Sequence, residues 1–367
     1  MMTEAPLPLP RHDPVMLREC LDWLRPAPGG IFLDGTLGLG GHAEAVLEQL
    51  APTGCLVGLD RDAEALSLAT ARLQAACVAH GWPQACVRTF HANVHDAGQV
   101  LQEAGIHVLD GCLFDFGVSS YQLDTPSRGF SFRQAGPLDM RMDSSGGRTA
   151  WELLHDLTEE DLARVLWEYG EERYSRRIAR RICERRVRGT LESTTDLEAA
   201  AWDAYPAAER HGRLHPATRT FQAVRIAVNE ELSALAPALE AAAALLAPGG
   251  CLVTLTYHSL EDRLVKQTLA FLAGQCRCAP ELPFCVCGTA PRVRLLVRRP
   301  AVPTPEEVER NPRARSARLR VCARVQDPGS GDAPSVGQVV VVRPREEFDR
   351  GRRETPSVHS RLPTIPL

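Results

Sequence analysis

Short apolar runs alternate with longer segments of helical spacing in the first third of the chain. The apolar runs predict strands at residues 31–33, 55–59, 87–90 and 108–114. Between them, residues 43–50 and 63–78 carry apolar positions at helical spacing. Strands separated by helices are typical of βαβ units, so the pattern predicts an α/β fold with a parallel sheet.

This alternation stops after residue 123. Residues 124–150 are rich in Gly, Arg, Asp and Ser and predict an ordered loop, whereas residues 151–210 have helical spacing throughout. A long amphipathic helix is expected over 224–246, and Pro237 should kink it or begin a second helix. The last predicted elements are a strand at 251–256, a helix at 260–272 and strands at 293–297 and 319–325.

These changes of pattern divide the chain into four expected parts. Residues 1–123 and 218–325 would form the two parts of one α/β domain, and residues 124–217 a helical subdomain inserted between them. Residues 326–367 contain Gly, Ser and Pro without any period, so we expect a disordered tail there.

The composition is typical of a globular protein. Of the 367 residues, 44% are hydrophobic and 24% are charged. There is no apolar run of about 18 residues, no secretory signal and no transit peptide, so we expect a cytoplasmic protein that does not span a membrane. The net charge of −4 argues against coating nucleic acid through bulk charge, although local basic patches are still available.

A glycine-rich turn follows the first predicted strand. The segment 34–42 reads DGTLGLGGH, and its glycines let the backbone approach a ligand closely. Asp60 ends the second predicted strand, where an acid can accept hydrogen bonds from a ribose diol. Gly38, Gly40 and Asp60 together favour a nucleoside cofactor site, and a plain tight turn is the alternative.

Two further acids sit at predicted strand ends. Asp34, four residues before Gly38, favours S-adenosylmethionine over NAD, because a carboxylate there can hold the cationic methionine end of the cofactor. Asp115 ends the fourth predicted strand, a position that faces the ligand in a doubly wound sheet. It could bind the cofactor or accept a hydrogen bond from a substrate amine, and a locally bonded loop cap is the alternative.

Arginines gather at two places. Arg173, Arg177, Arg180 and Arg181 belong to a run that continues to residue 188, and Arg313 and Arg315 fall with Arg318 and Arg320 at alternate positions of a late predicted strand. A guanidinium group binds phosphate well, so both clusters favour RNA binding. A solvated helix face is the alternative for the first cluster.

Four cysteines are also close together in the sequence. Cys276, Cys278, Cys285 and Cys287 offer four thiolates for tetrahedral zinc, although the C-x-C spacing is tighter than the common C-x₂-C. Free surface thiols or a redox pair are the alternative. The other cysteines are mostly single residues in apolar runs, which fits a reducing compartment.

Taken together, the motifs resemble those of the bacterial S-adenosylmethionine-dependent methyltransferases that modify N4 of a cytidine in 16S ribosomal RNA. The resemblance covers residues 12–325. Its ordered blocks are HDPVML at 12–17, DGTLGLGGH at 34–42, the segment 114–124, RGFSF at 128–132, GPLDMRMD at 136–143, YGEER at 169–173, HPATRTFQA at 215–223, HSLEDR at 258–263 and NPRARSA at 311–317.

This resemblance implies a class I methyltransferase fold, which is a Rossmann-like sheet with an inserted all-helical subdomain that recognises the substrate. The implied cofactor is S-adenosylmethionine, and the implied contacts are Gly40, Gly41, His42, Asp60, Asp115 and Gln122. Three positions depart from the family pattern: Leu39 stands where Arg or Ser is usual, Val94 where an aromatic residue is usual, and Tyr257 where Phe is usual. The implied partner is 16S rRNA in the small ribosomal subunit, and a homodimer is left open.

The expected reaction is methyl transfer to the exocyclic N4 of a cytidine in the decoding region of 16S rRNA. That amine is a poor nucleophile because its lone pair is delocalised into the ring, so the enzyme must orient it and accept its hydrogens. We expect Asp115 to hold the amine, and His258 is the second catalytic candidate, although it could instead orient Asp262 or a loop. The alternatives are a methyltransferase of this fold acting on another nucleic-acid amine, and an assembly factor that binds RNA without catalysis.

Overall fold

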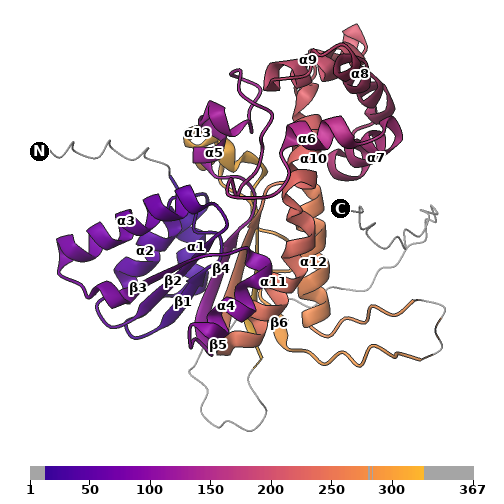
Figure 1. Cartoon of the computed structure of the whole chain (residues 1–367). Coiled ribbons are helices and arrows are strands. Elements are labelled where there is room, and N and C mark those ends of the chain that lie inside the picture. Colours follow the sequence, from indigo (N-terminus) through magenta and orange to yellow (C-terminus); the bar gives the residue numbers. More distant parts are fainter. Residues whose placement is uncertain (1–12, 280–281, 283, 326–367) are drawn as a thin grey trace, which may run out of the picture. The chain divides into compact units, whose positions relative to one another are not determined.

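A seven-stranded sheet lies at the centre of the computed structural model, which describes residues 13–279, 282 and 284–325 (Figure 1). Its strand order is β3-β2-β1-β4-β5-β7-β6. The first five strands pair in parallel, and β7 pairs antiparallel with both β5 and β6. The strands are β1 (Ile31–Asp34), β2 (Cys55–Asp60), β3 (Val87–His91), β4 (Leu109–Asp115), β5 (Leu246–Thr256), β6 (Val293–Leu295) and β7 (Arg318–Arg324). The predicted α/β, Rossmann-like fold class is confirmed.

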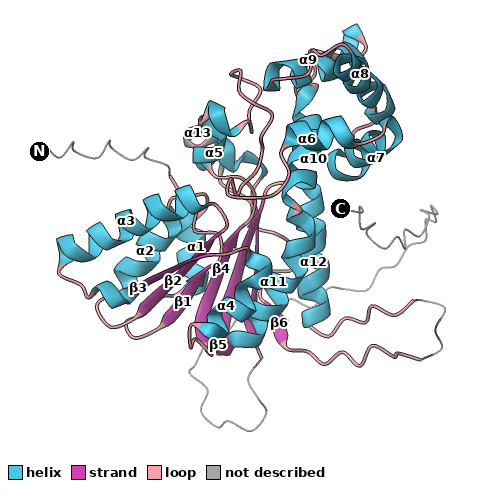
Figure 2. Cartoon of the chain, viewed as in Figure 1, coloured by secondary structure: helices cyan, strands magenta, loops and turns pink. Residues whose placement is uncertain are grey.

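Helices cover both faces of this sheet (Figure 2). Along β1, Phe32 packs against the face that carries α1, α2 and α3, and Leu33 packs against the opposite face with α4, α11 and α12. Alternate side chains of the buried strands therefore fill two separate cores. The helices of this part are α1 (Leu17–Leu24), α2 (Gly41–Leu50), α3 (Ala63–His80), α4 (Ala97–Glu103), α5 (Ser120–Asp124), α11 (Glu231–Leu245), α12 (Ser259–Leu272) and α13 (Pro305–Arg310).

A group of helices stands between α5 and α11 in the sequence. These are α6 (Ala150–Asp156), α7 (Glu159–Gly170), α8 (Ser175–Val187), α9 (Thr194–Ala204) and α10 (Ala217–Asn229). Helix α7 packs against both α8 and α10 within the group, and α10 contacts α11, which joins the group to the rest of the protein. The boundaries of an inserted subdomain at 124 and 217 stay a prediction, and the predicted disordered tail at 326–367 lies outside the described residues.

The expected long helix over 224–246 is wrong in one respect, because the chain breaks at Glu230 rather than at Pro237. Glu230 has φ 50°, and Pro237 is accommodated inside α11. Asn229 explains the break: its side chain accepts a hydrogen bond from Met142 N and donates one to Met140 O, each over 2.7 Å. These contacts hold the end of α10 against the 136–143 segment.

The late strand lies close to its predicted position, but two of the arginines placed on it precede it. Arg313 and Arg315 lie in a short 3₁₀ helix (Pro312–Ser316), and β7 begins at Arg318. Pro312 begins that turn, and Asn311 stabilises it because its side chain accepts a hydrogen bond from Arg313 N. None of the helices in the described part of the chain is long and apolar enough to cross a membrane.

Candidate active site

A cavity of about 440 Å³ opens at the carboxyl ends of the parallel strands. The glycine turn after β1, the end of β2 and the start of α5 form one wall. Helices α10 and α11 also line the cavity, through residues that include Gln222, Arg225 and Leu235. The edge where parallel strands end is the usual ligand site of an open α/β sheet.

Acids end three neighbouring strands at this edge: Asp34 on β1, Asp60 on β2 and Asp115 on β4. Asp60 lines the cavity, and its two carboxylate oxygens accept hydrogen bonds from Gly38 N at 2.6 Å and Asp62 N at 2.8 Å. Asp34 lies behind the cavity wall, is buried, and accepts a hydrogen bond from Thr36 N. The acid of β2 therefore positions the glycine turn that follows β1.

Burial makes these carboxyl groups harder to ionise. It raises the pKa of Asp34 to about 7, and the nearby charges of Asp115 and Asp60 act in the same direction. Burial also raises the pKa of Asp60 to about 6. A cluster of acids of this kind is destabilised by mutual repulsion and favours a cation among them.

Asp115 has partners from three parts of the cavity lining. Tyr257 donates its hydroxyl to Asp115 Oδ1 at 2.7 Å, and His42 Nδ1 lies 3.7 Å from Oδ2. The backbone N–H of Asp115 donates to Thr36 Oγ1 at 2.6 Å. Burial and the charge of Asp115 raise the pKa of Tyr257 well above its usual value, so its hydroxyl keeps its proton and acts as a donor.

Most of the proposed cofactor residues line this cavity. They are Gly38, Gly41, His42, Asp60, Asp115 and Gln122. Gly40 does not line it: with φ 78° it precedes α2, and a Cβ there would lie 3.4 Å from Ala69 Cβ. Gly41 is packed even more closely, since a Cβ would lie 2.9 Å from Pro14 Cγ. The turn is therefore held between α3 and the segment before α1.

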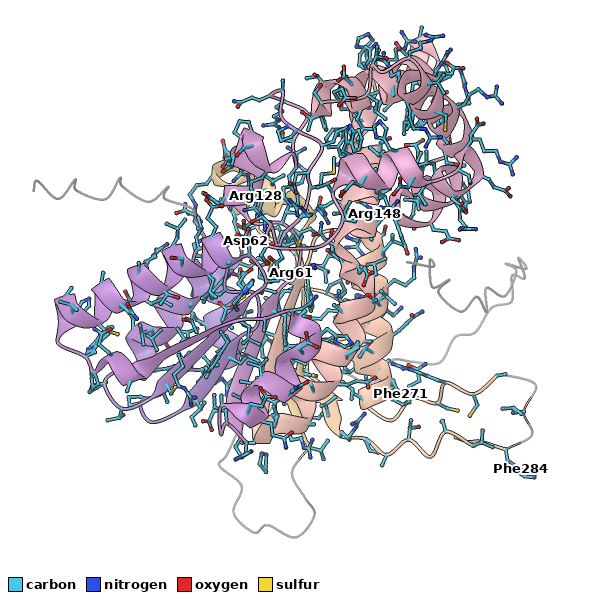
Figure 3. The ribbon with its side chains drawn as sticks, viewed as in Figure 1. Arg61, Asp62, Arg128, Arg148, Phe271 and Phe284 are labelled. Atoms are coloured by element: carbon cyan, nitrogen blue, oxygen red, sulfur yellow. The ribbon has the colours of Figure 1, made fainter. Side chains whose placement is uncertain are left out.

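Gln122 also holds the site together. Its side-chain N–H donates to Asp62 Oδ2 at 2.8 Å, and its oxygen accepts from Ser119 N. Asp62 is buried and pairs in addition with Arg128, whose guanidinium reaches Asp62 Oδ2 at 2.8 Å (Figure 3). Arg128 donates further to the carbonyls of Arg141 and Met142, so it connects the 136–143 segment to the start of α3.

Sequence reasoning missed the roles of Asp62 and Arg128. Asp62 has the signature of a helix N-cap, and its side chain does accept hydrogen bonds from Glu64 N and Ala65 N. The additional contact with Arg128 spans 66 residues of sequence, and no local pattern indicates it.

His258 lies apart from the main cavity. It is the N-cap of α12, and its Nε2 is 3.0 Å from the Oε1 of buried Glu261. It lines a second, smaller hollow together with Arg315 and Arg318. Asp262, the other expected partner of His258, instead pairs with Arg318 and Arg320. Burial works to raise the pKa of Glu261, but the hydrogen bond with His258 and the charge of Arg225 outweigh it, so that pKa is lowered.

The proposed RNA-binding arginines fall into two environments. Arg313 lines the main cavity and pairs with Asp124. On and before α8, Arg173 pairs with Glu209, Arg180 with Glu159, Arg181 with Glu184, and Arg177 lies over the Tyr174 ring. All four of these side chains are exposed.

One arginine of the same run has a structural role. Arg186 Nη1 donates to the carbonyls of Leu154, His155 and Leu157 at 2.8–3.0 Å, at the end of α6. These carbonyls have no partner within their own helix, so Arg186 stabilises the contact of α8 with α6.

A Rossmann-like sheet with a glycine turn, and with acids at the ends of adjacent strands around one cavity, defines an α/β protein of the methyltransferase class. The chain belongs to the MraW methylase family, whose family profile matches residues 10–325. The match covers every described strand and helix.

Relatives of high similarity share one name. The chain is 49% identical over 314 residues to "Ribosomal RNA small subunit methyltransferase H" of Geobacter sulfurreducens, which covers 86% of this chain and 99% of that protein. It is 45% identical to the protein of the same name from Trichlorobacter lovleyi, over 86% of this chain and 98% of the relative.

Solved structures are more distant. TrmN from Thermus thermophilus matches 84% of this chain and 48% of its own, with 14% identity and a TM-score of 0.37. A putative rRNA-methylase from Clostridium thermocellum matches 86% of this chain and all of its own, with 9% identity and a TM-score of 0.40.

Proposed function

We propose that this protein transfers a methyl group from S-adenosylmethionine to the exocyclic N4 of a cytidine in 16S rRNA of the small ribosomal subunit, in the decoding region. The observation that carries the proposal is the 49% identity, over 99% of its length, to a relative named as a small-subunit ribosomal RNA methyltransferase. The choice of N4 and of the decoding region rests on the motif resemblance alone.

The residues around the cavity fit S-adenosylmethionine. This cofactor, when bound, supplies a methyl group on a positively charged sulfur. The charges of Asp115 and Asp60 act on the buried Asp34 at this edge of the sheet, so the three acids together favour a cation nearby. Asp60 at the end of β2 would accept hydrogen bonds from the ribose, and the backbone of the glycine turn, at Gly38 and Gly41, would approach the cofactor closely.

Asp115 is the proposed acceptor for the cytosine amine. Tyr257 fixes Asp115 Oδ1, and the backbone bond to Thr36 fixes the end of β4, so the carboxylate is already positioned at the cavity. A carboxylate aimed at N4 would accept one of its hydrogens and raise the electron density on nitrogen as the N–C bond forms. Such preorganised electrostatics act without reorganisation at the moment of reaction.

The second proposed catalytic residue, His258, would act on Asp115 indirectly, through Glu261 and Tyr257. It lies at the start of α12, bound to Glu261, and Glu261 Oε2 accepts hydrogen bonds from the backbone N–H of Tyr257 at 2.8 Å. We therefore propose that His258 positions Tyr257 through Glu261.

RNA would reach the cavity past the helical group formed by residues 124–217, the proposed substrate-recognition subdomain. Arg313 is the arginine of the proposed set that lines the cavity, and Arg315 lines the hollow beside it. Arg173, Arg177, Arg180 and Arg181 would bind phosphates farther along the RNA. The ion pairs of Arg180 and Arg181 are exposed, so exchanging an acid for a phosphate costs little.

The test is transfer of labelled methyl from S-adenosylmethionine to small ribosomal subunits purified from a strain that lacks this activity. We expect label in 16S rRNA and, after digestion to nucleosides, N4-methylcytidine by mass spectrometry. The Asp115→Asn variant serves as the control for activity from contaminating enzymes.

The same experiment separates the two rivals. Label on a different amine would support a methyltransferase of this fold with another substrate. Binding of the subunits without any transfer of label would support an assembly factor that has lost catalysis, and would contradict the proposed reaction.

A further inference from the structure

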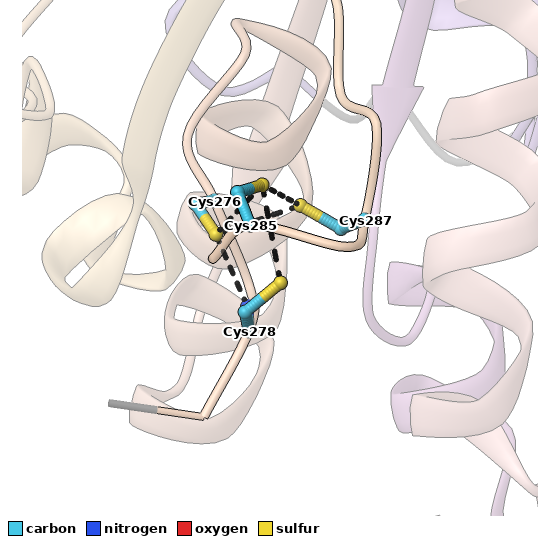
Figure 4. Close-up of side chains that lie close together, drawn as sticks. All are labelled: Cys276, Cys278, Cys285 and Cys287. Carbon is cyan, nitrogen blue, oxygen red and sulfur yellow. Dashed lines mark hydrogen bonds between the residues drawn. The ribbon is translucent and has the colours of Figure 1, made fainter. Parts of the chain in front are cut away.

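Four cysteine sulfurs converge in the loop that joins α12 to β6 (Figure 4). They belong to Cys276, Cys278, Cys285 and Cys287, and all four lie within 4.8 Å of one another. The sulfur of Cys285 is 3.5 Å from that of Cys276, 3.9 Å from that of Cys278 and 3.2 Å from that of Cys287. The sulfur of Cys287 is 3.5 Å from that of Cys276.

These distances suit a tetrahedral metal site. A zinc–sulfur bond of about 2.3 Å requires sulfur–sulfur edges of about 3.8 Å. The four observed edges, 3.2–3.9 Å, bracket that length, and all are far longer than the bond of a disulfide.

Neither burial nor thiol hydrogen bonding explains why the four sulfurs lie so close together. Cys276 and Cys285 are exposed and Cys278 and Cys287 half-buried, so the sulfurs are not gathered by burial in a core. The S–H group is a weak donor and sulfur a weak acceptor, so thiol–thiol contacts add little. By contrast, the free cysteines Cys112 and Cys322 are buried in the hydrophobic core.

Backbone N–H groups also point at the sulfurs. Cys278 N lies 3.3 Å from Cys276 Sγ, and Val286 N lies 3.3 Å from Cys278 Sγ. Donors directed at sulfur stabilise a thiolate and orient it, as the outer partners of metal ligands do.

The loop is anchored at both ends. Arg277, between the first two cysteines, stacks over Phe271 of α12 with its guanidinium carbon 3.8 Å from the ring centroid. At the other end, Arg292 N donates to Leu272 O at 2.8 Å. The anchors hold the two C-x-C pairs opposite each other across the loop.

We propose that Cys276, Cys278, Cys285 and Cys287 bind one zinc ion, which closes the loop between α12 and β6. Tetrahedral four-sulfur sites are typical of zinc or of iron, and four thiolates without an open position make a structural rather than a catalytic site. Helix α12 begins beside the active-site cavity and runs 14 residues to Leu272, roughly 20 Å, so the metal is remote from the methyl transfer site.

The test is the metal content of the full-length chain, purified with a reducing agent and without a chelator. Elemental analysis should find about one zinc per chain in the wild-type protein and almost none in the double variant Cys285→Ser/Cys287→Ser. The matched control is Cys183→Ser/Cys251→Ser, which removes two half-buried cysteines elsewhere and should keep the zinc.

A second measurement needs no variant and so does not depend on how a variant folds. Alkylation of exposed Cys276 and Cys285 in the wild-type protein should speed up at least about tenfold when a strong chelator is added, because a metal-bound thiolate is not available to the reagent. Protein without metal and with the same alkylation rate before and after chelation would overturn the proposal. So would iron in place of zinc, or two disulfides among these four residues under the same conditions.

Discussion

The acids at the ends of β1, β2 and β4 and the arginines of α8 are two groups of like charge, and they have opposite environments in the fold. Asp34 and Asp60 are desolvated, and burial raises the pKa of each. The α8 arginines Arg180 and Arg181 are exposed and form solvent-exposed ion pairs with Glu159 and Glu184. The acids therefore lower the free energy of unfolding, whereas the arginines change it little.

That difference suits the acids to cofactor binding or catalysis and the arginines to exchangeable contacts with RNA. A buried acid with a raised pKa costs stability above its unfolded pKa, so its retention in a cavity points to a ligand or a reaction. Exposed ion pairs contribute about 0–1 kcal/mol each and exchange partners readily. We therefore expect single changes among the acids to have large effects on catalysis or cofactor binding, and expect the arginines to act only as a group.

Asp115→Asn should have the largest effect. It keeps the size of the side chain and an oxygen that can accept from Tyr257, but it removes the charge aimed at the amine. We expect kcat to fall by about 10²-fold or more, as on removal of a preorganised electrostatic group. Steady-state kinetics with small subunits and varied S-adenosylmethionine measure this.

Asp110→Asn is a matched control on the same strand. Asp110 lies at the other end of β4, where its carboxylate accepts a hydrogen bond from Ile31 N at 2.7 Å, and the cavity is roughly 17 Å away. Its kcat should stay near wild type. If Asp115→Asn keeps full kcat and raises only the KM for S-adenosylmethionine, Asp115 binds the cofactor alone and the amine acceptor must be sought elsewhere.

Asp60→Ala comes next. We expect the affinity for S-adenosylmethionine to fall by a few kcal/mol, because the ribose hydroxyls lose a charged acceptor and the glycine turn loses the bond from Gly38 N. Isothermal titration calorimetry measures the change. Unchanged affinity would mean that Asp60 does not contact the ribose.

Three changed charges on α8 should have a smaller effect. Reversing Arg177, Arg180 and Arg181 to Glu should weaken binding of small-subunit RNA by about tenfold at low salt and flatten the salt dependence, while cofactor affinity stays the same. Filter binding over a salt series measures both quantities. Equal RNA affinity of the variant and the wild type would reduce this group to a solvated helix face.

The contrast between the two regions also explains what could be predicted from the sequence. Strand ends follow from local apolar runs, so the acids at those ends were placed at the correct edge of the sheet. Contacts made by side chains across long stretches of sequence leave no periodic signal. Asn229, which ends α10, binds Met140 and Met142 almost 90 residues earlier in the chain.

Arginine is the residue whose role was hardest to predict. Arg186 looks in the sequence like its neighbours, yet it binds three backbone carbonyls. Arg313 and Arg315 seemed to belong to a strand, yet they lie in a 3₁₀ turn. A guanidinium carries the same charge in every environment, so its role depends on acceptors that only the folded chain brings near it.

Tyr257→Phe should have the smallest effect. It tests the hydrogen bond by which Tyr257 holds Asp115 in place. The change removes one hydrogen bond to Asp115 Oδ1 and leaves the ring in place, so we expect kcat to fall by about fivefold, the equivalent of one hydrogen bond of about 1 kcal/mol. Because the pKa of Tyr257 is raised well above its usual value, its hydroxyl stays protonated and donates throughout the assay range. The ratio of wild-type to variant kcat should therefore be constant from about pH 6 to about pH 9, below the ordinary tyrosine pKa.

Tyr169→Phe is the matched control. It changes a half-buried tyrosine outside the cavity and should leave kcat at the wild-type value. A ratio that falls toward one as the pH rises would show that Tyr257 loses its proton in this range, and would contradict its role as the donor that holds Asp115 in place.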